Sequence, residues 1–192
     1  MKYRYITILL ILLVFTGCSS KSNFYQLHPK VQQSQNIKSG MKQTVVGIGE
    51  VEVPEYLKKS EVVTRLSAGR VEVHEVDRWA GSFSKNIQSV INDNISRLLP
   101  KYIFISHPWE EPISDDYRIY ITVNKFDGNN LGKVILEGRW SLVDKESDRV
   151  LLSESFTYSE TGGITLDEIV DTQSHLLEKL SRRIAQRIAK KI

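Results

Sequence analysis

The alternation of apolar and polar residues at positions 117–124 constrains the fold of this chain more than any other part of its sequence. Every second side chain there is apolar or aromatic, namely Tyr117, Ile119, Ile121 and Val123. A period of two is typical of a β-strand with one buried face. Two further apolar segments follow at 134–142 and 150–158, after polar turns at 127–130 and 144–148. The three segments predict an antiparallel meander.

Two other segments have the apolar spacing of amphipathic helices. In the first, at 83–99, apolar residues recur every three or four positions between Ser82, a good N-cap, and Pro100, which stops a helix. The second follows a predicted flexible break at 160–163, begins after a capping box formed by Thr165 and Glu168 and continues to the carboxy terminus. Both apolar stripes are wide enough to cover a sheet.

Shorter segments rich in β-branched and other apolar residues predict additional strands at 45–53, 61–66, 71–76 and 102–106. The predicted fold class is therefore α+β: a mixed, largely antiparallel sheet with two amphipathic helices packed on one face. We expect this single domain to occupy residues 44–192.

The amino terminus, residues 1–17, has the organisation of a secretory signal peptide. Its apolar stretch, Ile6 to Phe15, is shorter than the roughly 20 residues that a spanning helix needs. The sequence Phe-Thr-Gly-Cys that ends at Cys18 resembles the bacterial lipobox, which implies acylation of that cysteine. Ser19, where inner-membrane lipoproteins often carry Asp, implies the outer membrane. The alternative is a buried or accidental cysteine behind a signal cut elsewhere.

Residues 18–43 are expected to form a flexible, lipidated N-terminal tether in front of the domain. They are polar and rich in Gln and Ser, so they bury too little apolar surface to offset the entropy of ordering. About 20 such residues would let the domain stand roughly 25 Å from the lipid. The exception is Phe24-Tyr25-Gln26-Leu27, which we expect to dock as an edge strand. Its Phe24, Tyr25 and Leu27 are candidate partner contacts.

The sequence offers little for catalysis, metal ions or nucleic acid. Loss of Lys2 and Arg4 with the signal peptide leaves 24 basic and 23 acidic residues, too balanced for a nucleic-acid surface. A single Cys excludes an internal disulfide, and the four His have no metal-ligand spacing. We therefore predict no metal ion, no cofactor and no enzyme activity.

Three other patterns have a simpler interpretation than chemistry. The acid pairs Glu110-Glu111 and Asp115-Asp116 are neighbours in sequence and point apart, whereas catalytic carboxylates face each other. Gly47-Ile48-Gly49 lacks the further glycine and the helix of a dinucleotide site. Basic residues at the end of the terminal helix could bind anionic lipid, but they also complement the helix dipole. We favour a helix packed on the sheet.

The tryptophans differ in their expected roles. Trp140 follows the buried face of its strand and should be a core residue. Trp109 lies in a loop bounded by prolines and is the better candidate for contact with a partner.

Four motifs follow one another along the chain: FYQL at 24–27, VEVPEYL at 51–57, RWA at 78–80 and KVILEGRW at 133–140. Behind a lipobox, this order resembles the PqiC-like lipoproteins, a group of auxiliary lipoproteins of ABC-type and MCE-type lipid transport systems. Phe24 stands where that family has Tyr.

The resemblance implies a non-enzymatic subunit anchored by acylated Cys18 in the outer membrane and facing the periplasm. Its implied partners are a PqiB-like MCE-domain tunnel protein, the lipid bilayer, and further copies of the chain in a homo-oligomeric ring. The ring would receive the far end of the tunnel, so that lipid crosses the periplasm without meeting water. The alternative is a structural or assembly lipoprotein of the envelope that moves no lipid.

Overall fold

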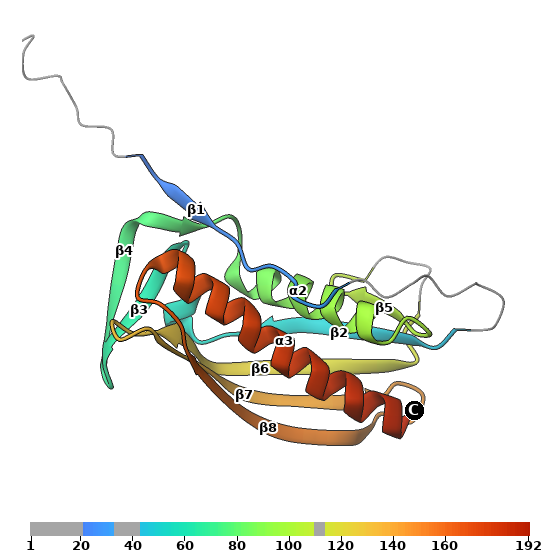
Figure 1. The fold of residues 1–192 in the computed structure, drawn as a ribbon. Coiled ribbons are helices and arrows are strands. Elements are labelled where there is room, and N and C mark those ends of the chain that lie inside the picture. Colours follow the sequence, from blue (N-terminus) through green and yellow to red (C-terminus); the bar gives the residue numbers. More distant parts are fainter. Residues whose placement is uncertain (1–20, 33–42, 110–113) are drawn as a thin grey trace, which may run out of the picture.

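The computed structural model describes residues 21–32, 43–109 and 114–192 (Figure 1). A five-stranded sheet carries both described helices on one face, and a three-stranded sheet stands at one end of it. The predicted α+β class, with two helices on one face of a mixed and largely antiparallel sheet, is confirmed. The sequence pattern did not show that the strands divide between two sheets.

Two helices, α2 (Phe83–Leu98) and α3 (Leu166–Lys191), pack on each other and on the larger sheet. The capping box at the start of α3 is confirmed: the Glu168 N–H donates to the Thr165 hydroxyl, and the Glu168 carboxylate accepts from the Thr165 N–H. The bonds that this carboxylate accepts from the Thr165 hydroxyl, at 2.7 Å, and from the Thr165 N–H lower the pKa of Glu168.

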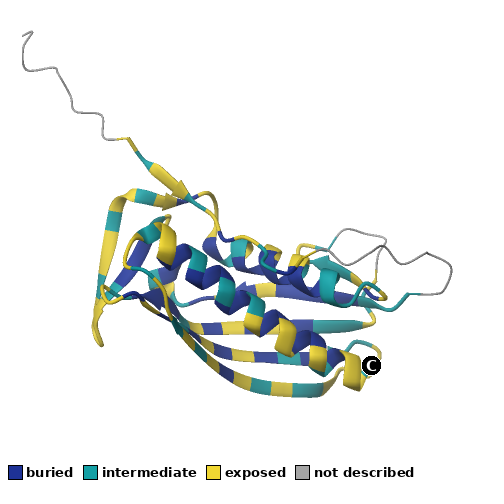
Figure 2. Ribbon diagram, viewed as in Figure 1, coloured by how far each residue is buried: buried dark blue, intermediate teal, exposed yellow. Residues whose placement is uncertain are grey.

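The helix faces toward the sheet are mostly apolar and are inaccessible to solvent (Figure 2); their buried Gln88 and Gln173 donate to backbone carbonyls of the sheet. Eight of their apolar side chains have no exposed surface, namely Ile87, Ile91, Ile95, Leu176, Leu177, Leu180, Ile184 and Ile188. Full burial of a side chain of this size contributes about 1.5–3 kcal/mol. The layer between helices and sheet is therefore the main hydrophobic core.

Three long strands form the predicted meander. β6 (Tyr117–Gly128), β7 (Lys133–Asp144) and β8 (Arg149–Thr161) pair antiparallel in sequence order. Trp140 lies on the inner face of β7 and is 1 % exposed, so its predicted place in the core is confirmed.

Two predicted breaks in the chain are wrong in position. The turn expected at 127–130 starts later, because β6 continues through Gly128. A Cβ at Gly128 would come within 2.7 Å of Ile169 of α3, so the glycine allows the helix to approach the strand closely. The break expected at 160–163 is shorter than predicted: β8 continues through Thr161, so of these four residues only Gly162 and Gly163 lie outside the strand.

The other half of the larger sheet is parallel. β2 (Val45–Glu52) lies between β6 and β5 (Ile103–Ser106) and runs in the same direction as both. Parallel neighbours cannot be joined by a hairpin and need a crossover connection. The connection from β2 to β5 contains α2, which covers these two strands.

The smaller sheet has the strand order β1-β4-β3. β3 (Glu61–Ser67) and β4 (Arg70–Trp79) form a hairpin, and β1 (Asn23–Tyr25) adds to β4 in parallel. The expected docking of this N-terminal segment as an edge strand is confirmed. The pairing of β4 with β3 jumps from His74 to Arg78, so the strand bends there.

Three basic side chains of α3 pair with acids on β8 of the sheet, whereas Arg182 pairs with Glu178 within the helix. Arg183 and Arg187 both bind Glu154 of β8, which pairs with the core residue Trp140 of β7. Lys179 binds Glu160 of the same strand at 2.7 Å. These contacts agree with the helix being packed on the sheet, the interpretation we favoured from the sequence.

One ion pair joins the two sheets. Arg65 of β3 donates two hydrogen bonds, of 2.9 and 2.7 Å, to Asp127 at the end of β6. The Tyr56 hydroxyl donates a third to the same carboxylate at 2.7 Å. Burial and the bond to Asp127 raise the pKa of Tyr56 to about 12, so the phenol remains a donor at neutral pH. Asp127 is only 2 % exposed.

This arrangement predicts that Asp127→Asn lowers the free energy of unfolding by about 3 kcal/mol, because it leaves Arg65 without its counter-charge in a largely buried position. Denaturation by urea at neutral pH measures the change. Asp148→Asn is the matched control: that carboxylate is 82 % exposed, and its loss should change the free energy by less than about 0.5 kcal/mol. Equal, small effects of both substitutions would contradict a joining role for the pair.

Candidate functional site

Residues 26–31 form an extended segment between α2 and α3, which we call the N-terminal strap (Figure 1). The Leu27 and Val31 N–H groups donate to the side-chain oxygens of Asn86 and Asn94 on α2, at 3.1 and 3.2 Å. Four residues of extended chain and eight residues of helix both cover about 12–13 Å. The strap therefore runs along α2 with matched spacing.

The strap is also anchored by its apolar side chains. Leu27 is 2 % exposed and belongs to the main core, and Val31 is 5 % exposed. Leu27 was expected at a surface for partners, and it is instead a core residue. Residues 28–31, which follow the segment expected to dock, were expected to be flexible, and this expectation is wrong, because Leu27 and Val31 bury enough apolar surface to order the segment.

Charged groups hold the strap to α3. The Lys30 ammonium binds the Asp171 carboxylate, and the His28 ring lies 3.3 Å from the same carboxylate. His175 approaches it from the other side, at 3.7 Å. The bond from Lys30 lowers the pKa of Asp171, so this carboxylate remains ionised well into the acid range.

The strap brings a serine, a histidine and an aspartate together, which the sequence did not suggest. Ser174 Oγ lies 3.4 Å from His28 Nδ1, and His28 Nε2 faces Asp171. A nucleophile must be accessible to substrate, but Ser174 has no exposed surface and donates its hydroxyl to the Val170 carbonyl at 2.9 Å. This trio serves to attach the strap to α3.

The remaining N-terminal candidates lie at the other end of the strap, on β1. Phe24 is 67 % exposed, whereas Tyr25 is half-buried and donates to Asp77 at 3.3 Å. Burial and the neighbouring Asp77 raise the pKa of Tyr25. Cys18, the predicted acylation site, lies outside the described residues.

Trp109 lies against the face of the larger sheet that points away from the helices. Its ring packs over Gly47, and the Arg118 guanidinium lies 4.4 Å from the ring centre. Asp115 accepts two hydrogen bonds from Arg118, at 2.7 and 2.8 Å. Burial opposes ionisation of Asp115, but the bonds from Arg118 outweigh it and lower the pKa of this carboxyl. Trp109 is therefore half-buried and held in place.

Gly47 and Gly49 thus have a structural explanation. Ile48 between them is completely buried on the helix side, so both glycines face the opposite side. A Cβ at Gly47 would lie 2.9 Å from the Trp109 ring, and one at Gly49 would lie 3.2 Å from the Tyr120 ring. The absence of side chains at these positions makes room for two aromatic rings.

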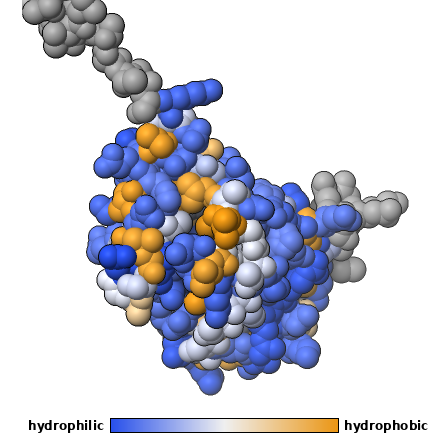
Figure 3. All heavy atoms as spheres, turned by 60° about the vertical axis from the view of Figure 1, so that its left-hand side comes forward, coloured by the Kyte–Doolittle hydropathy of each residue, from blue (hydrophilic) through white to orange (hydrophobic). Residues whose placement is uncertain are grey.

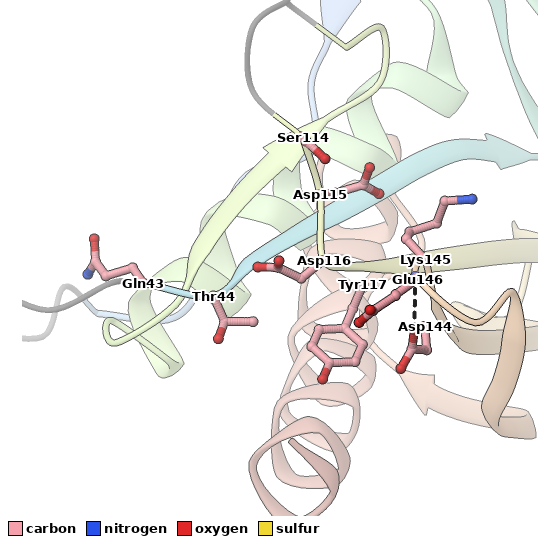
Figure 4. Close-up of a pocket in the computed structure, with 9 residues that line it drawn as sticks. All are labelled: Gln43, Thr44, Ser114, Asp115, Asp116, Tyr117, Asp144, Lys145 and Glu146. Atoms are coloured by element: carbon pink, nitrogen blue, oxygen red, sulfur yellow. Dashed lines mark hydrogen bonds between the residues drawn. The ribbon is translucent and has the colours of Figure 1, made fainter.

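A polar hollow of about 550 Å³ lies beside Asp115, at the end of the larger sheet where β2 and β6 begin (Figure 4). It is lined by Gln43, Thr44, Ser114, Asp115, Asp116, Tyr117, Asp144, Lys145 and Glu146. Its three aspartates already bind within the protein: Asp115 accepts from Arg118, Asp116 from the Val45 N–H and Asp144 from the Glu146 N–H. Of the predicted acid pairs, Glu110-Glu111 lies outside the described residues.

Within ranges 21–32, 43–109 and 114–192, no group of three His, Cys, Asp or Glu side chains is placed to hold a metal ion. In the same ranges, no helix is long and apolar enough to cross a bilayer.

Comparison with known proteins identifies the class. The family of ABC-type transport auxiliary lipoprotein components matches residues 25–185, and the chain belongs to this family. It is 30 % identical over 129 residues to the intermembrane transport lipoprotein PqiC of Escherichia coli K12, a match that covers 66 % of this chain and 67 % of the relative. PqiC of Shigella flexneri matches equally well. The PqiC-like resemblance drawn from the sequence motifs is confirmed.

Solved structures support the fold. One, of an uncharacterised protein, superposes with a TM-score of 0.73 at 22 % identity, covering 88 % of this chain and 99 % of that one. Protein XCC0632 from Xanthomonas campestris gives a TM-score of 0.66 at 13 % identity, covering 85 % and 92 %. At these identities the similarity concerns the fold alone.

The strap predicts that Leu27→Ala lowers the free energy of unfolding by about 3 kcal/mol, because the cavity left between the helices cannot fully close. Phe24→Ala, three residues away on an exposed side chain, is the control and should cost less than about 0.5 kcal/mol. Chemical denaturation of the domain measures both. A strap that was only loosely attached would give two equally small values.

The packing around Trp109 predicts that Gly47→Ala displaces the indole from the sheet. We expect the tryptophan emission to shift to longer wavelength and quenching by acrylamide to increase, because the ring becomes more exposed. Gly69→Ala is the control, since its Cβ would meet nothing within 4 Å. An unchanged spectrum for Gly47→Ala would mean that Trp109 is not seated on this glycine in solution.

Proposed function

We propose that the protein is the outer-membrane-anchored subunit of an MCE-type intermembrane lipid transport system. In this role it is a non-enzymatic adaptor, attached through acylated Cys18, that docks the far end of a periplasm-spanning tunnel protein. The observation that carries the proposal is the match to the transport auxiliary family over residues 25–185, with 30 % identity to an intermembrane transport lipoprotein.

The physical need for such an adaptor follows from the cargo. Exposure of lipid chains to water costs about 0.8 kcal/mol per methylene group, so lipid does not cross an aqueous space unshielded at a useful rate. A tunnel removes this barrier only if its end is held against the membrane. A rigid domain with a lipid anchor, assembled as a homo-oligomeric ring, would hold it there.

The face of the larger sheet that carries Trp109 is our candidate for the docking surface. The helices α2 and α3 cover the opposite face, and the strap is bound to both of them. The open face offers Trp109 and the 42 %-exposed Tyr120 to a partner. Aromatic residues beside an arginine, here Arg118, are frequent at the centres of protein interfaces.

The test is co-purification of the full-length lipoprotein from its membranes in mild detergent, with mass spectrometry of what accompanies it. We expect an MCE-domain protein, and we expect labelled palmitate on the chain. Recovery of a different envelope protein, with lipid distribution unchanged on deletion, would support a structural or assembly lipoprotein instead.

Two neighbouring substitutions separate attachment from destination. Cys18→Ser should abolish palmitate labelling and release the protein from membranes. Ser19→Asp should keep the label but send the protein to the inner membrane. From there it could no longer hold the far end of the tunnel protein at the outer membrane. Normal transport by the Cys18→Ser variant would overturn the anchored-adaptor proposal.

A further inference from the structure

The structure shortens the link between the acylation site and the folded domain. Because β1 is fixed to β4 and the strap is bound to both helices, free chain can extend only from Cys18 to Asn23. Five fully extended residues span at most about 18 Å. If Cys18 carries the anchor, the end of the domain that holds β1 must lie within this distance of the lipid.

Most of the exposed large apolar side chains of the described residues lie at the same end, six of nine. Six exposed apolar side chains belong to it: Phe24, Leu66, Val73, Val76, Leu131 and Ile164, which we call the apolar end. They come from β1, the β3–β4 hairpin, the β6–β7 turn and the segment before α3, which Figure 1 places together. Figure 3 views the molecule from this side, and apolar side chains gather there below the point where the N-terminal chain leaves.

The opposite end differs in character. It contains the polar hollow, the start of β6 and the β7–β8 turn, as the pairing of Tyr117 with Asp144 requires. α3 alone, at 26 residues, extends about 39 Å along the molecule. The link is therefore too short to let an upright domain reverse its two ends relative to the membrane.

We propose that the apolar end is a membrane-contacting surface, seated on the lipid bilayer that holds the anchor. This inference rests on the acylation of Cys18 in the proposed function and adds an orientation to it. The length of the link indicates that lipid, and not another protein, covers the apolar end. A folded domain is about 30 Å across and does not fit between the apolar end and a bilayer that is at most about 18 Å away. Charged residues of both signs, such as Arg70 and Glu72, accompany the apolar ones, so contact is with the interfacial layer.

The test uses the native acylated lipoprotein in vesicles of phosphatidylethanolamine and phosphatidylglycerol. Its only cysteine is blocked by the anchor, so an introduced cysteine takes a spin label at one place. Phe24→Cys and Leu131→Cys report on the apolar end; Leu131 is 73 % exposed. Val150→Cys, at the opposite end and 63 % exposed, is the matched control. Circular dichroism confirms that each labelled protein is folded.

We expect the labels at positions 24 and 131 to collide several-fold less with a water-soluble nickel complex than the label at 150, while remaining accessible to oxygen, which dissolves in lipid. Equal collision with nickel at all three positions would overturn the inference. Shielding from both nickel and oxygen would also overturn it, because a protein and not lipid would then cover the apolar end.

The mass of the purified protein separates the two proposals. Acyl chains on Cys18 together with water-exposed labels at the apolar end would overturn the orientation alone. A protein without acyl chains would overturn the anchor of the proposed function, and the orientation with it.

Discussion

The attachment of the N-terminal strap to the two helices is the constraint on which the functional geometry depends. Leu27 fills the core, Asn86 and Asn94 bind the backbone of the strap, and Lys30 pairs with Asp171. Each hydrogen bond contributes modestly by itself, about 0.5–1.5 kcal/mol. Together with the buried leucine they fix the position at which the amino terminus leaves the domain. A feature that looks like part of a tether thereby becomes part of the scaffold.

The two ends of the domain are made different by the direction of the strands. β2, β5 and β6 run parallel, so their first residues gather at one end, with the hollow and Trp109. The last residues of β6 lie at the other end, where Arg65 and Asp127 join the second sheet. The sheet thus separates an aromatic and acidic end from an apolar one by the length of a strand.

The sequence predicted the elements that depend on local pattern. Strict alternation in β6, the apolar stripes of both helices and the Thr165 capping box each arise from neighbours along the chain, and each was found. The errors concern long-range partners. Asp127 was predicted as a turn residue, because its partner Arg65 lies 62 positions away in the sequence and only the fold brings the two together. Leu27 was expected in a docking segment and at a partner surface, and its place in the core depends on helices that lie far from it along the chain.

The site was predicted only in part for the same reason. Trp109 was identified as a candidate from its loop, but its seat on Gly47 and under Arg118 depends on three segments meeting in space. Gly47 and Gly49 had no predicted role, because their role is to make room for the rings of Trp109 and Tyr120, which come from other segments. The available signals for the strap were Phe24-Tyr25-Gln26-Leu27, which was expected to dock, and Val31, a single apolar residue that the polar composition around it outweighed.

A short link also changes the strength of docking in the proposed arrangement. The effective concentration of a tethered group falls roughly as the −3/2 power of the flexible length. Reducing the free chain from about 20 residues to five would therefore raise it about eightfold, without any new contact. With the apolar end on the bilayer, the aromatic and acidic end would project into the periplasm, toward an arriving tunnel. The strap would then act on transport through geometry alone, by restricting where the docking face can be.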